Sequence, residues 1–271
     1  MAEWPVFVIN LPSATNRWHT ASRQLEHQGF VFERISGVDG ARLSTADIAD
    51  VYDAKRNRRI AKTPMTPEEI GCYLSHIQAW RRIGELGLSG AFILEDDFVA
   101  AANLADVLKS IPALAENWDL IKLHCGSVVH GWKLQPLVPG HDLFEFTKVP
   151  IRTLGYAITD RAAARLVERS VPFARPIDID HKHWWELGVR IMGVYPPVLE
   201  VDHRYLSTST IGEARRRRRE QATFLERVAR GVRHIRDETR YQIGIRKHRP
   251  IRVPPEAEAE TDVVEPTSHD P

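Results

Sequence analysis

The chain has 271 residues, 43% of them hydrophobic, and its 37 Lys and Arg almost balance its 36 Asp and Glu. This length suits one large α/β domain or two small ones. The charge is uneven: residues 213–252 hold 14 Lys and Arg against 5 Asp and Glu, whereas residues 253–271 hold six acids and no Lys or Arg. Residues 1–212 are therefore near neutral, which does not indicate a nucleic-acid-binding domain.

The cysteine content and hydropathy predict a reducing, non-membrane-spanning setting. Cys72 and Cys125 are too few for a disulfide framework. No stretch approaches the roughly 20 apolar residues of a spanning helix. The first five residues lack the basic and apolar segments of a signal peptide. We therefore expect a cytoplasmic protein.

The N-terminal apolar run, residues 6–9, predicts an interior strand that ends at Asn10-Leu11. Ser13 or Thr15 can cap the helix that follows, which places Arg17 near its start. A strand, a polar turn and a helix N-terminus with an arginine form an anion-binding arrangement. The alternative is an ordinary connecting turn.

A second strand is predicted at residues 30–35, followed by the turn Gly37-Val38-Asp39-Gly40. Asp39 could accept hydrogen bonds from ribose hydroxyls, as acids after a strand do in dinucleotide folds. An Asx turn is the competing interpretation. Residues 41–65 are expected to be irregular, and their basic cluster at residues 55–59 either meets phosphates or forms a solvated face.

Thr66-Pro67-Glu68-Glu69 predicts a helix start, with Thr66 as the N-cap, Pro67 in the first turn and Glu69 completing a capping box. Apolar residues then follow at helical spacing to Ile83. The same helix carries Cys72, Ser75 and His76. For a single imidazole such as His76, a satisfied core histidine is the commoner case, and a ligand is the alternative.

The most informative stretch is the short buried strand predicted at residues 90–94, which runs directly into Glu95-Asp96-Asp97. Ligands of open α/β sheets sit beyond the carboxyl ends of the strands. Three adjacent carboxylates repel one another unless a cation neutralises them, and hard oxygen ligands suit Mg²⁺ or Mn²⁺ held with a diphosphate. A solvated acidic turn is the alternative.

The next segments continue the alternation: a helix over 103–115, strands over 119–124 and 153–158, an edge hairpin around 143–146, and a helix from Thr159 or Asp160 to Arg169. Alternating strands and helices of these lengths predict a mainly parallel central sheet flanked by helices. We assign residues 1–212 to this domain. The polar loop at residues 207–212 could close over a diphosphate.

Residues 175–185 allow two interpretations. In an extended chain Asp178 and Asp180 point the same way, and two nearby histidines and tryptophans could add metal ligands and sugar-stacking faces; these are His181, His183, Trp184 and Trp185. Alternatively the segment is a helix N-terminus, with Asp178 or Asp180 as the cap and the tryptophans in the core.

Residues 213–252 predict a basic helical extension with a partial apolar stripe, suited to an anionic membrane surface at the inner face of a membrane. The alternatives are nucleic acid, which we do not expect, and a helix packed on the domain with solvated arginines. The acidic tail, residues 253–271, is expected to be disordered.

Taken in chain order, these motifs resemble glycosyltransferase family 25, the lipopolysaccharide and lipooligosaccharide biosynthesis transferases. The resemblance covers almost all of residues 6–212. Its pieces are Val8-Ile9-Asn10-Leu11 with Arg17, Ser36-Gly37-Val38-Asp39-Gly40, Glu69-Ile70-Gly71-Cys72-Tyr73-Leu74-Ser75-His76, Ile93-Leu94-Glu95-Asp96-Asp97, Gly155-Tyr156-Ala157-Ile158-Thr159 and Pro176-Ile177-Asp178.

The resemblance implies a GT-A-like α/β fold and transfer of a hexose, such as galactose, from a UDP-sugar to a hydroxyl of a glycan acceptor, with inversion. The acceptor belongs to lipopolysaccharide or another surface glycan and can be lipid-linked. A divalent ion, Mn²⁺ or Mg²⁺, would neutralise the leaving diphosphate, and a carboxylate would take the acceptor's proton.

The residues carried over have three roles. Glu95 and Asp97 would hold the metal, with His203, His181 or His183 completing its coordination. Asp178 or Asp180 would be the base. The nucleotide would contact Asn10, Leu11, Arg17, Val38, Asp39, Gly40, Ser75, His76 and Asp96. A metal-dependent phosphoesterase and a non-catalytic binding relative are the alternative functions.

Overall fold

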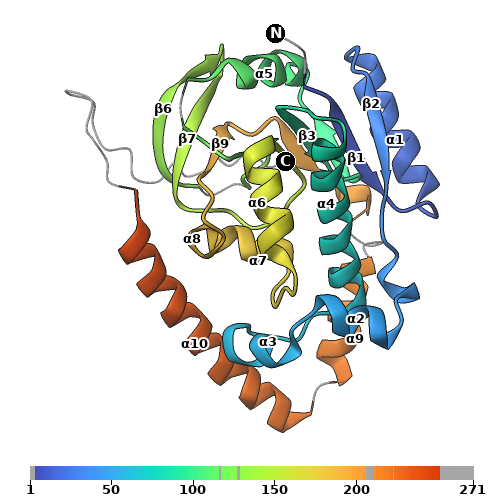
Figure 1. Ribbon diagram of the computed structural model, residues 1–271, viewed down its shortest axis with the longest axis vertical. Coiled ribbons are helices and arrows are strands. Elements are labelled where there is room, and N and C mark those ends of the chain that lie inside the picture. Colours follow the sequence, from blue (N-terminus) through green and yellow to red (C-terminus); the bar gives the residue numbers. More distant parts are fainter. Residues whose placement is uncertain (1–3, 116, 127–128, 206–209, 222, 251–271) are drawn as a thin grey trace, which may run out of the picture.

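The computed structural model describes residues 4–250 except 116, 127–128, 206–209 and 222. An eight-stranded sheet lies between layers of helices (Figure 1). In spatial order its strands are β2 (Phe32–Ser36), β1 (Val6–Asn10), β3 (Gly90–Leu94), β8 (Gly155–Thr159), β5 (Leu120–Lys122), β9 (Ile191–Tyr195), β7 (His141–Lys148) and β6 (His130–Val138). Two short strands, β4 (Phe98–Ala100) and β10 (Leu199–Val201), form a separate antiparallel pair.

The sheet is mixed, so the expectation of a mainly parallel sheet was wrong. β1 pairs in parallel with β2 and β3, and β5 with β9. β8 is antiparallel to both of its neighbours, β3 and β5. The hairpin of β6 and β7 joins β9 in antiparallel fashion. The alternation of strands and helices in the sequence does not determine the direction of a strand. β8 follows the β6–β7 hairpin in the chain and inserts between two earlier strands, β3 and β5, in the opposite direction.

Two apolar cores fill the two faces of the sheet. Every residue of β1 is buried, and its side chains alternate, with Val6 and Val8 in one core and Phe7 and Ile9 in the other. Helices α1 (Thr15–His27) and α5 (Leu104–Ser110) cover the first core, and α4 (Pro67–Glu85) and α6 (Asp160–Ser170) cover the second. A sheet covered on both faces reads as continuous apolar runs, which explains residues 6–9 and 90–94.

Helix α4 begins as predicted. The backbone N–H of Thr66 donates to Glu69 Oε2 at 2.7 Å, and that of Glu69 donates to Thr66 Oγ1 at 3.3 Å. Pro67 occupies the first turn. The capping box and the apolar periodicity are therefore confirmed as the cause of this long helix.

Residues 41–65 are more regular than expected. They contain the 3₁₀ turn Gly40–Arg42 and two short helices, α2 (Thr45–Val51) and α3 (Ala54–Ile60), capped by Ser44 and Asp53. The basic cluster lies on α3, where its side chains are exposed apart from buried Asn57. The cap signals predict these helices, and the polar composition had hidden them.

Residues 175–185 are helical rather than extended, forming α7 (Ile177–Lys182) and α8 (Trp184–Leu187). Asp178 and Asp180 therefore do not share a face, because residues two apart on a helix point in different directions. Neither is the cap, since Pro176 occupies that position without a side-chain hydrogen bond. The helical interpretation was right and the assigned cap wrong.

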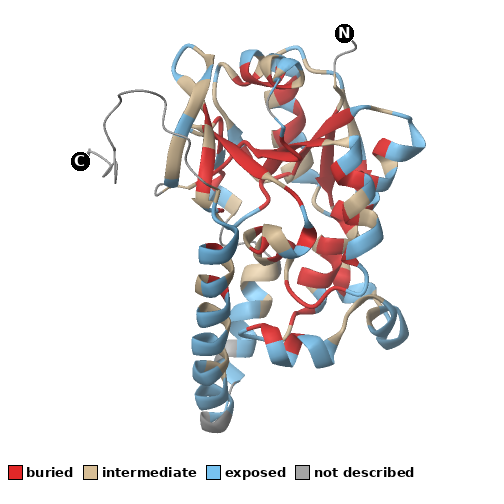
Figure 2. Ribbon diagram, turned by 60° about the vertical axis from the view of Figure 1, so that its left-hand side comes forward, coloured by how far each residue is buried: buried red, intermediate tan, exposed pale blue. Residues whose placement is uncertain are grey.

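Two helices follow the sheet, α9 (Thr210–Gln221) and α10 (Phe224–His248). Arg215 on α9 pairs with buried Glu69, Nη2 to Oε1 being 2.6 Å. Helix α10 runs along the outside of the molecule beside α3 and is largely exposed (Figures 1 and 2). The acidic tail and residues 207–209 of the polar loop lie outside the described residues. Among the described helices, none combines the length and apolarity that crossing a membrane requires.

Candidate functional site

The acidic triplet lies at the carboxyl edge of the three parallel strands β2, β1 and β3. Glu95-Asp96-Asp97 immediately follows β3, Asn10 ends β1, and the Gly37–Gly40 turn follows β2. Parallel strands deliver their carboxyl ends to the same edge, which is why segments far apart in sequence meet here. The expected placement of the triplet is confirmed.

Asp96 is held by two residues from the first strand and helix. Arg17 Nη1 lies 3.1 Å from Asp96 Oδ1, and Asn10 Nδ2 donates to Asp96 Oδ2. Arg34 in turn donates to the side-chain oxygen of Asn10. Burial raises the pKa of Asp96, while Arg17 and Asn10 oppose that shift. Asp96 therefore fixes Arg17 at the site and is itself neutralised by protein groups.

Glu95 is held by His76 and Thr153. Thr153 Oγ1 donates to Glu95 Oε1, and His76 Nε2 lies 3.5 Å from the same oxygen. Burial raises the pKa of Glu95, but the contacts with His76 and Thr153 outweigh burial and leave that pKa below its ordinary value. Glu95 is therefore a carboxylate at neutral pH.

Asp97 is less well compensated, because the Arg17 charge and a backbone hydrogen bond, which act to lower its pKa, do not offset burial and the acidic neighbours. Its Oδ1 is buried and, among the described residues, finds no hydrogen-bond donor. Burial, together with the charges of Glu95 and Asp96, raises the pKa of Asp97 to about 7. A carboxylate with one buried oxygen that lacks a hydrogen-bond donor fits a cation ligand, because a cation supplies positive charge at that oxygen.

The turn after β2 is clamped onto α4. Ser75 Oγ accepts from the Val38 N–H at 2.8 Å and donates to the Gly71 carbonyl at 2.7 Å. A Cβ on Gly71 would lie 2.5 Å from the Val38 oxygen, and one on Gly40 would lie 1.8 Å from the Pro67 oxygen. The helix and the turn therefore approach at a distance that only glycine permits. Asp39 accepts from the Ala41 N–H at 3.1 Å, which is the Asx-turn alternative.

A cavity of about 200 Å³ lies between this turn, the start of α4 and the acidic triplet. It brings together most of the residues predicted for nucleotide and metal, namely Leu11, Arg17, Val38, Asp39, Gly40, Ser75, His76, Glu95, Asp96 and Asp97. Asn10 is buried behind it and reaches it through Asp96. Six further lining residues were not named individually as site residues by sequence reasoning, namely Ile9, Gly37, Ala41, Glu68, Cys72 and Ile211. Helical spacing from His76 could have found Glu68 and Cys72.

Asp178 lies beside a buried lysine that sequence reasoning missed. Lys122 in β5 is 2% exposed, and burial lowers its pKa to about 8 although Asp178 and Glu95 act in the opposite direction. Lys122 Nζ donates to the Arg152 carbonyl, and the Arg152 N–H lies 3.4 Å from Asp178 Oδ2. An apolar-flanked lysine in a strand gave no sign of a site in the sequence.

Asp180 belongs instead to a buried network. It accepts from Tyr73 Oη at 2.9 Å and pairs with Arg175 Nε at 2.9 Å. Burial raises its pKa, with Arg175 and Tyr73 opposing. These partners give Asp180 a structural role between α4 and α7, outside the residues that line the cavity.

The three candidate histidine ligands are not gathered at the cavity. His181 is buried against Trp80 and Tyr156, and burial lowers its pKa well below its ordinary value. His183 Nδ1–H donates to the Ile179 carbonyl at 2.9 Å. His203 is exposed, in the 3₁₀ turn His203–Tyr205.

Trp184 and Trp185 are half-buried and pack on one another. Trp185 also stacks on the Tyr241 and His248 rings of α10. These contacts agree with the packed-helix interpretation for Trp185, whereas Trp184 lines a second cavity.

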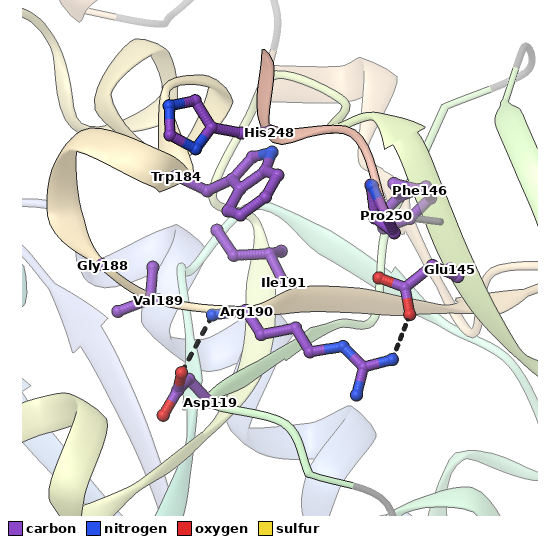
Figure 3. Close-up of a pocket in the computed structure, with 10 residues that line it drawn as sticks. All are labelled: Asp119, Glu145, Phe146, Trp184, Gly188, Val189, Arg190, Ile191, His248 and Pro250. Atoms are coloured by element: carbon purple, nitrogen blue, oxygen red, sulfur yellow. Dashed lines mark hydrogen bonds and ion pairs between the residues drawn. The ribbon is translucent and has the colours of Figure 1, made fainter. Parts of the chain in front are cut away.

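That second cavity is larger, about 340 Å³, and lies between β9, α8 and the end of α10 (Figure 3). Trp184, Val189 and Ile191 form its apolar wall. Its charged groups are engaged with one another: the Arg190 N–H donates to Asp119 at 2.9 Å, and its guanidinium pairs with Glu145. The cavity contains none of the acidic-triplet residues, so the smaller cavity is the better candidate for chemistry.

Proteins of similar sequence identify the class to which the chain belongs. The sequence profile described as Glycosyltransferase family 25 (LPS biosynthesis protein) matches residues 3–181. The chain is 28% identical over 192 residues to procollagen galactosyltransferase 1 of Danio rerio. It is 28% identical over 186 residues to a glycosyltransferase 25 family member of Anopheles gambiae, and 26% identical over 185 residues to procollagen galactosyltransferase 2 of Homo sapiens.

The chain therefore belongs to glycosyltransferase family 25. The three alignments cover 65% of this chain but only 29–30% of each relative. The match to the family includes the acidic triplet and ends at His181, before α9 and α10.

Proposed function

We propose that the protein is a GT-A-like, inverting glycosyltransferase that moves a hexose, preferentially galactose, from a UDP-sugar to a hydroxyl of a glycan. The observation that carries the proposal is Asp97, whose buried Oδ1 has no hydrogen-bond donor among the described residues, beside Glu95 in a cavity that also presents Arg17. Family membership makes glycosyl transfer the reaction to which this site is assigned. The names of the galactosyltransferase relatives support galactose.

The donor set fits a hard divalent ion, Mn²⁺ or Mg²⁺. Glu95 and Asp97 would hold it, since both line the cavity and Asp97 Oδ1 lacks a hydrogen-bond donor among the described residues. His203 is exposed and outside the cavity lining, so we do not retain it as a ligand. Such an ion, when bound, supplies positive charge to the diphosphate leaving group.

The protein groups provide binding and orientation. Arg17, held in place by Asp96, would contact phosphate, and the clamped Val38-Asp39-Gly40 turn would receive the nucleoside. The pocket's shape is preformed, because the Gly71 contact fixes the turn before any ligand arrives.

Direct displacement at the sugar carbon requires a base for the acceptor hydroxyl. We assign this role to Asp178 rather than Asp180. Neither residue lines the cavity, but Asp178 is half-buried, with the Arg152 N–H 3.4 Å from its Oδ2, whereas both partners of Asp180 are committed to packing. Asp178 would accept the hydroxyl proton as the new glycosidic bond forms and the bond to UDP breaks.

The test is calorimetric titration of the full chain with UDP, with and without Mn²⁺. Asp97→Asn should reduce Mn²⁺-dependent UDP binding at least about tenfold, since it removes one charged ligand. Asp178→Asn is the matched control: it should retain UDP binding and lose transfer from UDP-galactose. UDP binding that is equally tight without metal, or unaffected by Asp97→Asn, would overturn the metal assignment.

The acceptor we propose is a glycan of lipopolysaccharide or another surface glycan, including a lipid-linked one, as the family description suggests. Metal-dependent hydrolysis of UDP-galactose or a simple phosphoester at the same rate with and without glycan acceptors would instead favour the phosphoesterase alternative.

We also propose that α10 lies on an anionic membrane surface at the cytoplasmic face. The helix has two unlike sides. Tyr241 and Ile245 are 3% and 8% exposed and pack inward, whereas four apolar residues on the opposite side are 51–69% exposed, namely Val228, Val232, Ile235 and Ile243. By helical spacing, Arg236, Arg246 and Lys247 lie within or beside this stripe. An apolar stripe with basic flanks is complementary to anionic lipid headgroups above an acyl layer.

A further inference from the structure

We propose that Cys72, His76 and Glu95 form a binding site for a soft divalent cation of the Zn²⁺ class in the wall of the same cavity. This site differs in its chemistry from the hard-ion pair Glu95 and Asp97, with which it shares one ligand. It does not depend on the protein being a glycosyltransferase, because it concerns only which cation these side chains bind.

The geometry converges from two elements. Cys72 and His76 lie one turn apart on α4, so their side chains share a face. Glu95 follows β3 and enters from the opposite wall. One ligand atom from each of the three residues lies within 4.8 Å of the other two, and His76 Nε2 to Glu95 Oε1 is 3.5 Å. Ligand atoms of tetrahedral zinc lie roughly 3.5 Å apart, so the three ligand atoms need to move only slightly closer together to reach the spacing of a zinc site.

His76 is oriented for metal binding. It is 0% exposed, and its Nε2 makes no hydrogen bond with any described residue, although it points toward Glu95. Its other nitrogen, Nδ1, lies 2.8 Å from Tyr156 Oη, which also accepts from Trp80 Nε1 at 2.9 Å. When Nδ1–H donates to Tyr156, the lone pair of Nε2 is free for a cation, the second-sphere arrangement seen at metal-bound histidines.

The charges and the ligand types select the ion. A thiolate and a carboxylate together neutralise a divalent cation, and sulfur with imidazole favours Zn²⁺ over Mg²⁺ or Ca²⁺. Coordination would displace the proton of the Cys72 thiol. All three residues line the cavity, which leaves a fourth position open toward it. Three protein ligands with an open position are typical of an exchangeable zinc site rather than a structural one.

Sharing Glu95 has a consequence for the hard-ion site. A zinc ion held by Cys72, His76 and Glu95 withdraws the carboxylate that we assign to Mn²⁺. Zn²⁺ should therefore compete with Mn²⁺ for the cavity, and the competition should depend on Cys72, which the hard-ion pair does not use.

The test uses Co²⁺, alone, as the probe on the full-length chain. Thiolate coordination gives Co²⁺ a near-ultraviolet charge-transfer absorption that oxygen and nitrogen ligands do not give. We expect this absorption to appear, to vanish when one equivalent of Zn²⁺ is added, and to be lost in Cys72→Ser.

The matched control is Cys125→Ser, because the sequence contains only these two cysteines. Cys125 is buried and its Sγ lies 3.5 Å from the Val194 carbonyl, outside the set. The Cys125→Ser variant should therefore retain the charge-transfer absorption. A folded wild-type protein without the absorption, its persistence in Cys72→Ser, or its loss only in Cys125→Ser would overturn the proposal. Because no nucleotide is present, failure of UDP binding leaves this result unaffected.

Discussion

Asp97 shows how three adjacent carboxylates acquire different properties from their surroundings. Arg17 and Asn10 compensate Asp96, and His76 and Thr153 compensate Glu95, whereas burial raises the pKa of Asp97 to about 7. The sequence presents them as an equivalent run. Their neighbours, drawn from β1, α1, α4 and the loop before β8, make Asp97 the carboxylate that most needs a cation.

His183 couples the packing of α10 to pH. It is 1% exposed, lies against Trp185 and Tyr241, and has its pKa lowered to about 4, chiefly by burial and then by the nearby Arg175 charge. An unfolded histidine titrates near 6.5. Between those pH values the unfolded chain binds a proton that the folded protein excludes, so the stability contribution is complete above about pH 6.5 and is lost as pH falls toward 4.

We therefore expect the free energy of unfolding to fall from pH 7 to pH 4, with His183 accounting for at most about 3 kcal/mol. His183→Gln should make the free energy of unfolding depend less strongly on pH, and the dependence that remains should be the part due to His181. Urea unfolding at a series of pH values measures it. His203→Gln, at an exposed histidine, is the control and should follow the wild type; an unchanged slope in His183→Gln would contradict the assignment.

At the scale of elements, α4 organises the site. Its first turn pairs with α9 through Glu69 and Arg215, Gly71 and Ser75 hold the turn after β2, and His76 reaches Glu95. On the other side of α4, Tyr73 is buried in the core and stacks on Phe173 with ring centroids 4.2 Å apart. One helix therefore sets the spacing between the nucleoside turn and the acidic triplet.

Gly71→Ala should separate the turn from α4, because the added Cβ would meet backbone atoms at 2.5–2.6 Å. We expect a destabilisation of about 1–3 kcal/mol by urea unfolding and weaker UDP binding by calorimetry. Gly84→Ala on the same helix is the matched control: its Cβ meets nothing within 4 Å, so it should stabilise the protein by about 0.5–1 kcal/mol. Equal effects of the two substitutions would refute the close-contact explanation.

At the scale of the molecule, the site and the exposed stripe of α10 belong to one continuous structure. Helix α10 is joined to the domain through Tyr241 and Ile245, by the Arg236 bond to the Arg58 carbonyl at 2.6 Å, and by Lys182 Nζ, 3.7 Å from the Tyr241 ring. A surface that adsorbed α10 would therefore also fix the orientation of the sheet and its cavity.

The double variant Val232→Asp/Ile235→Asp should weaken sedimentation with phosphatidylserine-containing liposomes at least about tenfold, since it places two charges in the apolar stripe. Val31→Asp/Ile151→Asp changes net charge equally at two other exposed apolar positions and should bind as the wild type does. Equal loss of liposome binding in both double variants would indicate that the added negative charge alone accounts for the loss, and not the disruption of the apolar stripe. A wild-type dimer that becomes monomeric in the stripe variant, without liposome binding, would identify a second copy as the occupant.

The sequence by itself determined the elements whose signals are local. The apolar runs of β1 and β3, the capping box of α4 and the acidic triplet at the end of a buried strand are all confirmed. Because strand ends meet at one edge of a sheet, motif order was also sufficient to gather most of the cavity lining. The resemblance to family 25 is confirmed by the family match.

Only the tertiary structure decided properties that depend on contacts between distant residues. The direction of β8, the commitment of Asp180 to Tyr73 and Arg175, and the convergence of Cys72 with Glu95 have no local signal. The same holds for the pKa values at the site, because burial and partner charges are properties of the assembled fold. A sequence shows which groups are available, and packing decides which of them remain without a partner.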